Sequence, residues 1–327
     1  MTLAKSLLRL LGRQEYIRLG IRDRIIRACH NPDTAKSEEF AVPFFGSTYK
    51  GNLNSYLDWT VFYYGAHERE DLRLIQEILE PVAEPVAFDV GANVGHHALF
   101  AARFTERLYA FEPFEGVSEK MVEKLTDNHI TNVEVCKFGL GENNSLEDYT
   151  PPDKINPGTG NFLGNGSVGH TPLKLQIRKG DDIVEEKHLD RLDFIKMDVE
   201  GFEPFALKGL ERTLAELRPV VFFEWTPSSR HEGASATAST LFPKDYLFYD
   251  VIGHTPAFKL FRQPTYRLVR LRDGWVNSDL PGFTNLLAVP KEYLEKVNAQ
   301  SPLPAIARRL NAAGASGAAG VSALSTL

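Results

Sequence analysis

The feature that most constrains the fold is a regular alternation of short apolar runs with longer helical patterns between residues 86 and 224. The apolar runs have the length of buried strands. Strands are predicted over residues 86–89, 108–112, 133–138, 192–198 and 220–224, and helices over residues 95–103, 116–128 and 204–217. Strands that alternate with helices at this spacing form parallel crossover units. We therefore predict a doubly wound α/β sheet with helices on both faces.

The chain of 327 residues is long enough for one large α/β domain with additions. We expect a basic amphipathic arm over residues 1–28, an N-terminal cap over 29–80, the α/β domain over 81–300 and a disordered tail over 301–327. The tail is assigned from its last residues, which are mainly alanine, glycine and serine without charge. The cap is assigned from its many aromatic residues.

The arm carries seven basic residues against two acidic ones, so its net charge is +5 while the rest of the chain is −11. Leucine and isoleucine are interleaved with these charges at spacings that partly fit an amphipathic helix. We favour a helix that docks on its own domain and leaves a basic face in solvent. The alternative is weak contact with an anionic membrane surface.

The composition excludes several function classes. With 37 basic and 43 acidic residues, the net charge of −6 argues against a general nucleic-acid binder, because phosphate contacts need a basic surface. Cys29 and Cys136 provide neither a disulfide framework nor a zinc site of the usual spacing, which favours a reducing compartment. The sequence has no apolar run near the length of about 20 residues that crosses a bilayer, and no export signal. We therefore expect a cytoplasmic protein.

Acidic residues stand at the ends of four of the five predicted strands. They are Asp89, Glu112, Asp198 with the nearby Glu200, and Glu224. In an open parallel sheet, ligands bind outside the carboxyl ends of the strands. We expect a site there that accepts hydrogen bonds or positive charge.

The turn after the first predicted strand, DVGANVG over residues 89–95, points to a nucleoside cofactor without a polyphosphate. Its glycines permit a tight turn and close approach to a ligand. Their spacing and the preceding Asp89 differ from the GxGxxG turn that accepts a pyrophosphate. Glu112 follows Asp89 by 23 residues, near the offset of roughly 20 at which an acid accepts hydrogen bonds from ribose hydroxyls. S-adenosylmethionine, with its adenosine, sulfonium and amino-acid parts, meets these requirements.

Several segments carry a family resemblance. They are FDVGANVG (88–95), YAFEPF (109–114), DFIKMDVEGFEPFALKG (193–209) and RPVVFFEW (218–225), with YGAHERE (64–70) and TNLLAVP (284–290) as flanking elements. Together they resemble the FkbM-type S-adenosylmethionine-dependent methyltransferases over roughly residues 60–290, and KMDVEGFE is the most specific piece. The resemblance implies a seven-stranded Rossmann-like sheet and O-methylation of a hydroxyl on a small molecule or saccharide.

The resemblance also implies roles for individual residues. Asp89, Gly91, Asn93 and Gly95 would cradle the methionine part of the cofactor, Glu112 would bind the ribose, Phe114 and Leu140 would lie near the adenosine, and Glu68 would close over the cofactor. His96 and His97 stand where the family usually has an aromatic and a small polar residue, and we assign them no role.

Methyl transfer to oxygen needs an aligned hydroxyl and a group that takes its proton. We expect Asp198 nearest the methyl donor and Glu200 in the substrate wall, and either could be the base. Alternatively, Asp198 orients the cofactor and Glu200 caps the helix that begins near Pro204. Glu224 could line the acceptor site or be a buried structural carboxylate. These three acids could also hold a divalent cation, and the sequence leaves the metal open.

Other candidates lie in loops and in the cap. His170 is a candidate substrate-binding residue, and both His170 and His231 lie in segments expected to hang over the site, where either could accept a proton. Residues 143–180 are expected to shape the acceptor pocket. The aromatic residues that could stack on a sugar, with packing as the default explanation, are Tyr56, Trp59, Tyr63, Tyr64 and Trp225.

The predicted function is that of an S-adenosylmethionine-dependent O-methyltransferase. A nicotinamide-dependent oxidoreductase is disfavoured by Asp89 and by the glycine spacing of the first turn. A non-catalytic adaptor is disfavoured because the acidic strand ends are all retained. The identity of the acceptor and the oligomeric state stay open.

Overall fold

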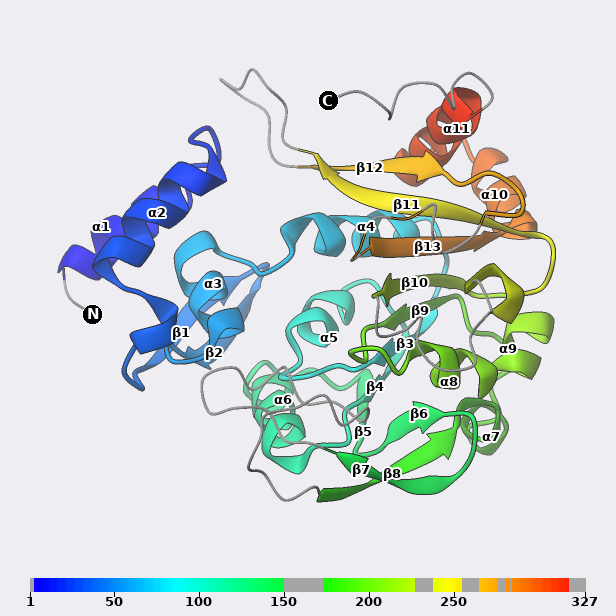
Figure 1. Cartoon of the computed structure of the whole chain (residues 1–327), viewed down its shortest axis with the longest axis horizontal. Coiled ribbons are helices and arrows are strands. Elements are labelled where there is room, and N and C mark those ends of the chain that lie inside the picture. The colour runs from blue at the N-terminus through cyan, green and yellow to red at the C-terminus, as the bar shows by residue number, and fades with distance from the viewer. Residues whose placement is uncertain are drawn as a thin grey trace.

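The computed structural model describes residues 3–149, 173–226, 238–254, 265–275, 280, 282 and 284–317. A central sheet has helices packed on both faces, and the N-terminal helices lie at one margin of the molecule (Figure 1). None of the helices formed by these residues is long and apolar enough to span a lipid bilayer.

The central sheet has the strand order β12-β11-β13-β10-β9-β3-β4-β5. Its parallel part consists of β3 (Val86–Val90), β4 (Arg107–Phe111), β5 (Val133–Cys136), β9 (Phe194–Met197) and β10 (Val220–Trp225). The antiparallel part consists of β13 (Thr284–Pro290), β11 (Tyr246–His254) and β12 (Thr265–Arg270). The predicted α/β fold class is confirmed. The sheet has eight described strands instead of seven because β12 pairs with β11 and extends one edge.

Successive residues of the central strands point to opposite faces of the sheet and enter two separate cores. Ala87 and Phe194 belong to one core, and their neighbours Phe88 and Ile195 belong to the other. The first core is covered by α4 (Arg69–Leu79), α5 (His96–Ala101) and α6 (Glu115–Asp127), and the second by α7 (Gly180–Glu186), α8 (Glu203–Lys208) and α9 (Glu211–Glu216). The sheet therefore has helices on both faces, as predicted.

The predicted helix over residues 204–217 is in fact two short helices, α8 and α9. Gly209 lies between them, and a Cβ at this position would overlap the carbonyl oxygen of Gly141. The carboxylate of Asp181 accepts hydrogen bonds from the backbone N–H groups of Arg212 (3.1 Å) and Thr213 (2.9 Å). This carboxylate satisfies the first turn of α9 and thereby fixes a new helix start.

A second, smaller sheet follows β5. It consists of β6 (Gly139–Gly141), β8 (Leu173–Lys179) and β7 (Ser145–Tyr149), in that order. β7 and β8 fall within the excursion predicted over residues 143–180, whereas β6 precedes it. Residues 150–172, which include His170, lie outside the described residues.

The expectation of a disordered tail is wrong for residues 305–317, which form α11 (Ala305–Gly317) after α10 (Lys291–Asn298). Ile306, Ala307 and Leu310 are buried, and the guanidinium of Arg309 donates a 2.7 Å hydrogen bond to the carboxylate of Glu77 on α4. Alanine is a strong helix former, and the low complexity of the segment concealed a buried apolar face. Residues 318–327 lie outside the described residues.

The N-terminal part contains α1 (Leu3–Gly12), α2 (Leu19–Cys29), the hairpin of β1 (Glu39–Phe44) and β2 (Ser47–Asn52), and α3 (Tyr56–Tyr64). α1 packs on α3, where the guanidinium of Arg9 donates to the carbonyl oxygen of Phe62 at 3.2 Å. A Cβ at Gly12 would overlap the carbonyl oxygen of Tyr63, so the two helices approach closely. The arm is thus docked on its own chain, which was the favoured interpretation.

Candidate active site

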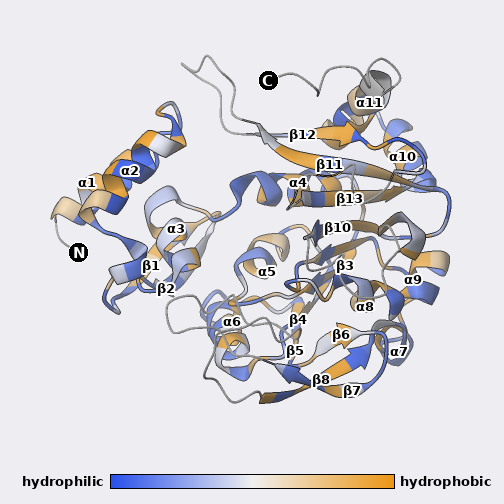
Figure 2. Cartoon of the chain, in the orientation of Figure 1, coloured by the Kyte–Doolittle hydropathy of each residue, from blue (hydrophilic) through white to orange (hydrophobic). Residues whose placement is uncertain are grey.

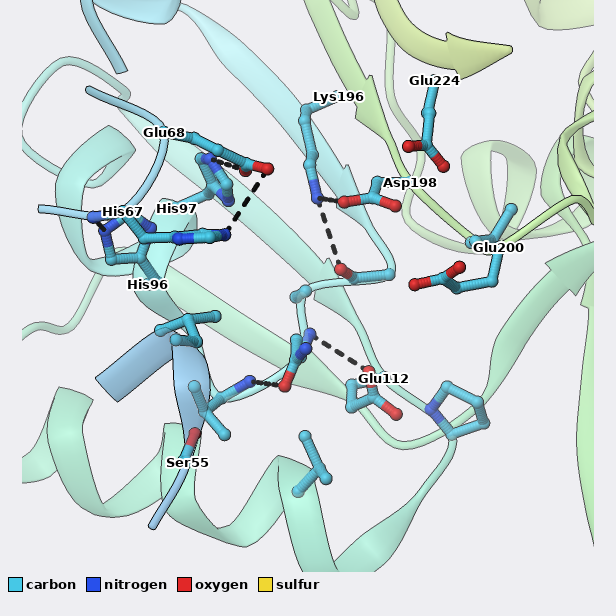
Figure 3. A pocket seen from close by; sticks show the side chains of 18 of the residues that line it. Ser55, His67, Glu68, His96, His97, Glu112, Lys196, Asp198, Glu200 and Glu224 are labelled. Atoms are coloured by element: carbon cyan, nitrogen blue, oxygen red, sulfur yellow. Dashed lines mark hydrogen bonds and ion pairs between the residues drawn. The ribbon is translucent and has the colours of Figure 1, made fainter. Parts of the chain in front are cut away.

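A cavity of about 360 Å³ lies at the carboxyl ends of β3, β4, β9 and β10 (Figure 3). Of the residues proposed from the sequence, those that line it are Glu68, Gly91, Asn93, Glu112, Asp198, Glu200 and Glu224. Those that do not are Asp89, Gly95, Phe114 and Leu140. The strand ends therefore bring most of the proposed residues together around one space.

The turn that follows β3 contains two glycines at which the backbone lies very close to neighbouring elements. Gly91 has φ +78°, and a Cβ there would overlap the carbonyl oxygen of Asp198 at the end of β9. Gly95 has φ +80°, and a Cβ there would lie 2.6 Å from the Cγ of Met121 on α6. Gly91 therefore lets the turn lie against β9 at the cavity, whereas Gly95 serves the packing of α5 on α6.

Glu112 fixes the turn from the end of β4. One carboxylate oxygen accepts a 3.0 Å hydrogen bond from the backbone N–H of Asn93, and the other accepts a 3.0 Å bond from the N–H of Phe114. Burial raises the pKa of Glu112 to about 7. Each oxygen keeps a further lone pair, so the carboxylate can still accept a hydrogen bond from a ligand hydroxyl.

Lys196, in the middle of β9, is a functional residue that the sequence analysis missed. Its Nζ lies 3.6 Å from an oxygen of Asp89 and 3.4 Å from an oxygen of Asp198, and it donates to the carbonyl oxygen of Gly91 at 3.4 Å. Although burial opposes it, the charges of Asp198 and Asp89 raise the pKa of Lys196. The lysine is therefore a buried cation between β3 and β9.

Asp89 lies behind Lys196 and not in the cavity wall. It is 2% exposed, and neither of its carboxylate oxygens has a hydrogen-bond partner among the described residues. Lys196 is the cation that compensates it. The signal for Lys196 was present in the sequence, since it is a charged residue inside the apolar run FIKM of the most family-specific segment.

Three carboxyl groups, those of Asp198, Glu200 and Glu224, lie together on the wall formed by the ends of β9 and β10 (Figure 3). Burial, reinforced by the charge of Asp198, raises the pKa of Glu200 to about 7 and that of Glu224 to about 8. Both groups therefore exchange protons near neutral pH, which suits acid and base chemistry.

The turn after β9 is held by Glu203 and not by Glu200. The carboxylate of Glu203 accepts hydrogen bonds from the backbone N–H groups of Val199 (2.9 Å) and Gly201 (3.2 Å). The alternative prediction was that Glu200 caps the helix that begins near Pro204. In the structure, Glu203 and not Glu200 accepts backbone hydrogen bonds at this point. Glu200 has φ +53° and its side chain lines the cavity.

The opposite wall contains Glu68 and three histidines (Figure 3). The carboxylate of Glu68 lies 3.5 Å from Nε2 of His67 and 3.6 Å from Nε2 of His97. Burial lowers the pKa of His97 to about 3, so this ring is neutral at physiological pH. His96 Nε2 accepts a hydrogen bond from the backbone N–H of His67 at 3.3 Å. The two histidines that depart from the family pattern therefore belong to the cavity wall.

The aromatic candidates divide into packing residues and cavity residues. Trp59, Tyr63 and Trp225 are fully buried, so packing accounts for them. Tyr56 is 38% exposed and lines the cavity. Phe114 does not reach the cavity, but its ring centroid lies 5.6 Å from that of Tyr149, which does. Leu140 is buried in the core on the α7 side of the sheet.

A second cavity, of about 460 Å³, adjoins the first between α2 and the start of α4. Tyr56, His67 and Glu68 line both cavities. Tyr64, Arg27 and other polar residues of α2 and α4 complete the second one. Nothing local in the sequence predicted it, because its walls come from three helices separated along the chain.

Within the ranges that the structure describes, no group of three or more His, Cys, Asp or Glu side chains is placed to hold a metal ion. His170 and His231 lie outside these ranges.

Fold and site together define a Rossmann-like methyltransferase. The chain belongs to the FkbM methyltransferase family, because the model of the Methyltransferase FkbM domain matches residues 89–252, half of the chain. The family predicted from the sequence is confirmed, and the oxidoreductase alternative has no support left.

Known proteins show more distant similarity. Hexuronic acid methyltransferase AglP of Haloferax volcanii is 27% identical over 114 residues, which cover 35% of this chain and 45% of AglP. Among solved structures, methyltransferase FkbM of Methylobacillus flagellatus is 22% identical, with a TM-score of 0.38 over 63% of this chain and 43% of that one. An S-adenosylmethionine-dependent methyltransferase of Agrobacterium tumefaciens is 11% identical, with a TM-score of 0.41 over 79% and 71% of the two chains.

The methyl donor of the protein is S-adenosylmethionine, and the residues present fit it. Gly91 lines the cavity where the first turn lies against the end of β9, and Glu112 retains acceptor capacity at the end of β4. Carboxyl groups outnumber cations in the cavity lining, where Lys196 is paired with Asp89 and Asp198, and such a lining suits a sulfonium.

Proposed function

We propose that the protein transfers the methyl group of S-adenosylmethionine to a hydroxyl of a saccharide or another small hydroxylated molecule. The observation that carries the proposal is the convergence of Asp198, Glu200 and Glu224 on one cavity, with the pKa of two of them near neutrality. A base with a pKa near the working pH is best suited to take a hydroxyl proton. The relative AglP is a hexuronic acid methyltransferase, which supports a saccharide acceptor.

The residues of the first turn and Glu112 hold the cofactor in this proposal. Gly91 and Asn93 lie against its methionine part, and Glu112 accepts a hydrogen bond from a ribose hydroxyl. Phe114 acts through Tyr149, which lines the cavity and whose ring centroid lies 5.6 Å from that of Phe114. When bound, S-adenosylmethionine supplies an electrophilic methyl group on a sulfonium.

Glu200 is the proposed base. The ammonium of Lys196 lies 3.4 Å from an oxygen of Asp198, so this carboxylate is already engaged in an ion pair. Asp198 is therefore assigned to orienting the charged donor, and Glu224 to the acceptor wall. Glu200 would take the hydroxyl proton as the methyl carbon passes from the sulfonium sulfur to the acceptor oxygen, with S-adenosylhomocysteine as the leaving group. A positioned base is worth about 10²- to 10⁴-fold in rate.

The acceptor is proposed to enter through the second cavity and to contact Tyr56, which lines both spaces. An exposed aromatic ring beside charged and polar side chains suits the apolar face and hydroxyl edge of a sugar. The net charge of −6 supports a small acceptor over a nucleic acid.

The test is methyl transfer by the purified full chain to a panel of uronic acid glycosides, neutral glycosides and other hydroxylated metabolites. Binding of S-adenosylhomocysteine is measured in parallel by calorimetry. We expect a methyl ether, and we expect Glu200→Gln to lower kcat by about 10²-fold or more while affinity for S-adenosylhomocysteine changes little.

Three results would count against the proposal. A product that mild base hydrolyses would be a methyl ester and would make a carboxyl group the acceptor. An unchanged kcat in Glu200→Gln would remove its role as base. Binding of S-adenosylhomocysteine without turnover on any acceptor would favour the non-catalytic adaptor.

A further inference from the structure

The outer face of α1 and α2 exposes an unusual density of large apolar side chains. Seven of the first 25 residues belong to this set, and each is between 42% and 79% exposed: Leu3, Leu7, Leu10, Tyr16, Leu19, Ile21 and Ile25. The other described residues contribute six such side chains, which are scattered over the cap, α6 and the two sheets. Figure 2 shows apolar stretches on both helices, at the margin of the molecule away from the central sheet.

The charged side chains exposed on the same face are all basic. Arg18 and Arg24 are exposed there and border the same hollow of α2. The two acidic residues of the arm are engaged on its inner side. Glu15 forms an ion pair with Arg69 on α4, and the carboxylate of Asp23 pairs with Arg27 (2.9 Å) and accepts a hydrogen bond from the hydroxyl of Tyr64 (2.9 Å). The exposed face therefore combines apolar and cationic groups without an exposed carboxylate.

A shallow hollow of about 320 Å³ lies on this face of α2. Its lining consists of Arg18, Gly20, Ile21, Arg24 and Ile25. Two guanidinium groups thus border an apolar floor. This arrangement suits an anionic headgroup next to hydrocarbon, because arginine binds phosphate oxygens with two parallel hydrogen bonds.

The inner face of the arm holds this surface in a fixed shape. Arg22 is buried and donates to the carbonyl oxygen of Gly12, which joins α2 to α1. Ile26 is fully buried in the first core, the one covered by α4, α5 and α6, and α1 packs on α3. The arm is therefore already folded on the protein, and docking would not have to order it.

We propose that the outer face of α1 and α2 docks on a membrane surface that carries anionic lipid headgroups. The leucine and isoleucine side chains enter the boundary between headgroups and acyl chains, and the arginines contact the headgroup phosphates. This inference is independent of the proposed acceptor. Because residues of α2 also line the second cavity, docking brings that cavity close to the lipid surface.

A second copy of the chain fits this face less well. Two arms that met face to face would bring Arg18 and Arg24 near the same residues of the partner. The exposed apolar side chains outside the arm in the described residues lie on separate elements, so they form no matching apolar layer. An anionic lipid surface offers both complements at once, namely phosphate charge and an apolar layer beneath it.

The experiment is flotation of the full chain with vesicles of phosphatidylcholine alone and with vesicles of equal parts phosphatidylcholine and phosphatidylglycerol. We expect binding to the anionic vesicles, weakened by added salt. Arg18→Gln with Arg24→Gln should weaken this binding roughly 10- to 30-fold, since each cation near an anionic surface contributes about 1 kcal/mol. Leu7→Gln with Ile21→Gln should weaken it to a similar degree.

Matched controls carry the same changes elsewhere on the surface. Leu146→Gln with Leu173→Gln removes exposed apolar side chains from the small sheet, and Lys291→Gln with Lys296→Gln removes exposed charges from α10. These variants should bind vesicles like the unaltered chain, and circular dichroism should show that all variants are folded.

The inference is overturned if the chain floats with neither vesicle, or if the arm variants and the controls bind equally. It is also overturned if light scattering shows a dimer that the Leu7 and Ile21 variant dissociates while vesicle binding is absent, since the face would then be a contact between copies.

Discussion

The cavity has two walls whose carboxylates are used in different ways. At the ends of β3 and β4, Glu112 gives both of its oxygens to backbone N–H groups of the turn that it fixes. At the ends of β9 and β10, Glu200 and Glu224 receive no hydrogen bond from another described residue, and burial raises the pKa of both. The first wall is fixed by hydrogen bonds from the backbone, whereas Glu200 and Glu224 in the second wall are not held by such bonds from the described residues.

Lys196 lies between these two walls and is shared by them. Asp89 behind it belongs to β3, and Asp198 beside it follows β9. The cofactor side and the proposed acceptor side are therefore coupled through one buried cation. Variants in each wall, and at Lys196, should show what each wall contributes to stability, cofactor affinity and acceptor binding.

The largest effect is expected for Lys196→Met, which would break the coupling. Removal of one partner from a buried ion pair leaves an uncompensated charge and typically costs 3–5 kcal/mol in the free energy of unfolding, here estimated as about 4 kcal/mol. Urea unfolding followed by circular dichroism measures this loss in the free energy of unfolding.

The matched control is Lys208→Met, because Lys208 also lies 3.4 Å from a carboxylate, that of Glu142, but both side chains are nearly half exposed. Exposed pairs contribute about 0.5 kcal/mol. Equal losses in the two variants would mean that Lys196 does not compensate buried acids.

The next effect is expected on the cofactor wall. In Glu112→Gln, the amide NH₂ would face a backbone N–H of Asn93 or Phe114, so one donor would lose its acceptor. Affinity for S-adenosylhomocysteine should fall by about 1–3 kcal/mol, measured by calorimetry. Glu115→Gln is the control, since Glu115 lies on the first turn of α6 and is exposed. An unchanged affinity in Glu112→Gln would show that the turn does not depend on this carboxylate.

The two walls also differ in how far the sequence predicts them. The glycine turn and Glu112 follow from local spacing along β3 and β4, because both act on backbone within a few residues of a strand end. The acids at the ends of β9 and β10 were found by the same rule. The different roles of these acids could not be predicted in this way. They depend on Lys196, which lies near Asp89 only because β9 pairs with β3.

Other failures of prediction have physical causes of the same kind. The break between α8 and α9 depends on the contact of Gly209 with Gly141 and on Asp181, which lies about 30 residues earlier in the chain. The helix α11 was missed because composition does not reveal an apolar face that packs on α4 and β12. Local pattern predicts elements, whereas contacts across elements decide where those elements end and which charges are compensated.

A smaller effect should appear in the pH dependence of stability at the acid wall. The ordinary pKa of Glu224 is 4.5, and burial raises it to about 8. The folded chain therefore holds this proton more tightly than the unfolded chain, and the resulting stabilisation is present below pH 4.5 and lost as the pH rises through 8. Glu224→Gln should raise the free energy of unfolding by about 1–2 kcal/mol at pH 9 relative to pH 5. Urea titrations at both pH values measure this difference, and a parallel pH dependence in the two proteins would contradict it.

The smallest effect is expected for Tyr56→Ala, which tests whether the two walls serve different ligands. Tyr56 lines both cavities, and loss of a ring stacked on a sugar costs about 0.5–1.5 kcal/mol. The KM for the acceptor should rise about 3- to 10-fold, whereas affinity for S-adenosylhomocysteine should stay the same. Phe45→Ala is the matched control, because Phe45 is 37% exposed, close to the 38% of Tyr56, and lines neither cavity. If Tyr56→Ala instead weakened cofactor binding and left the acceptor KM unchanged, the acceptor would not pass through the second cavity.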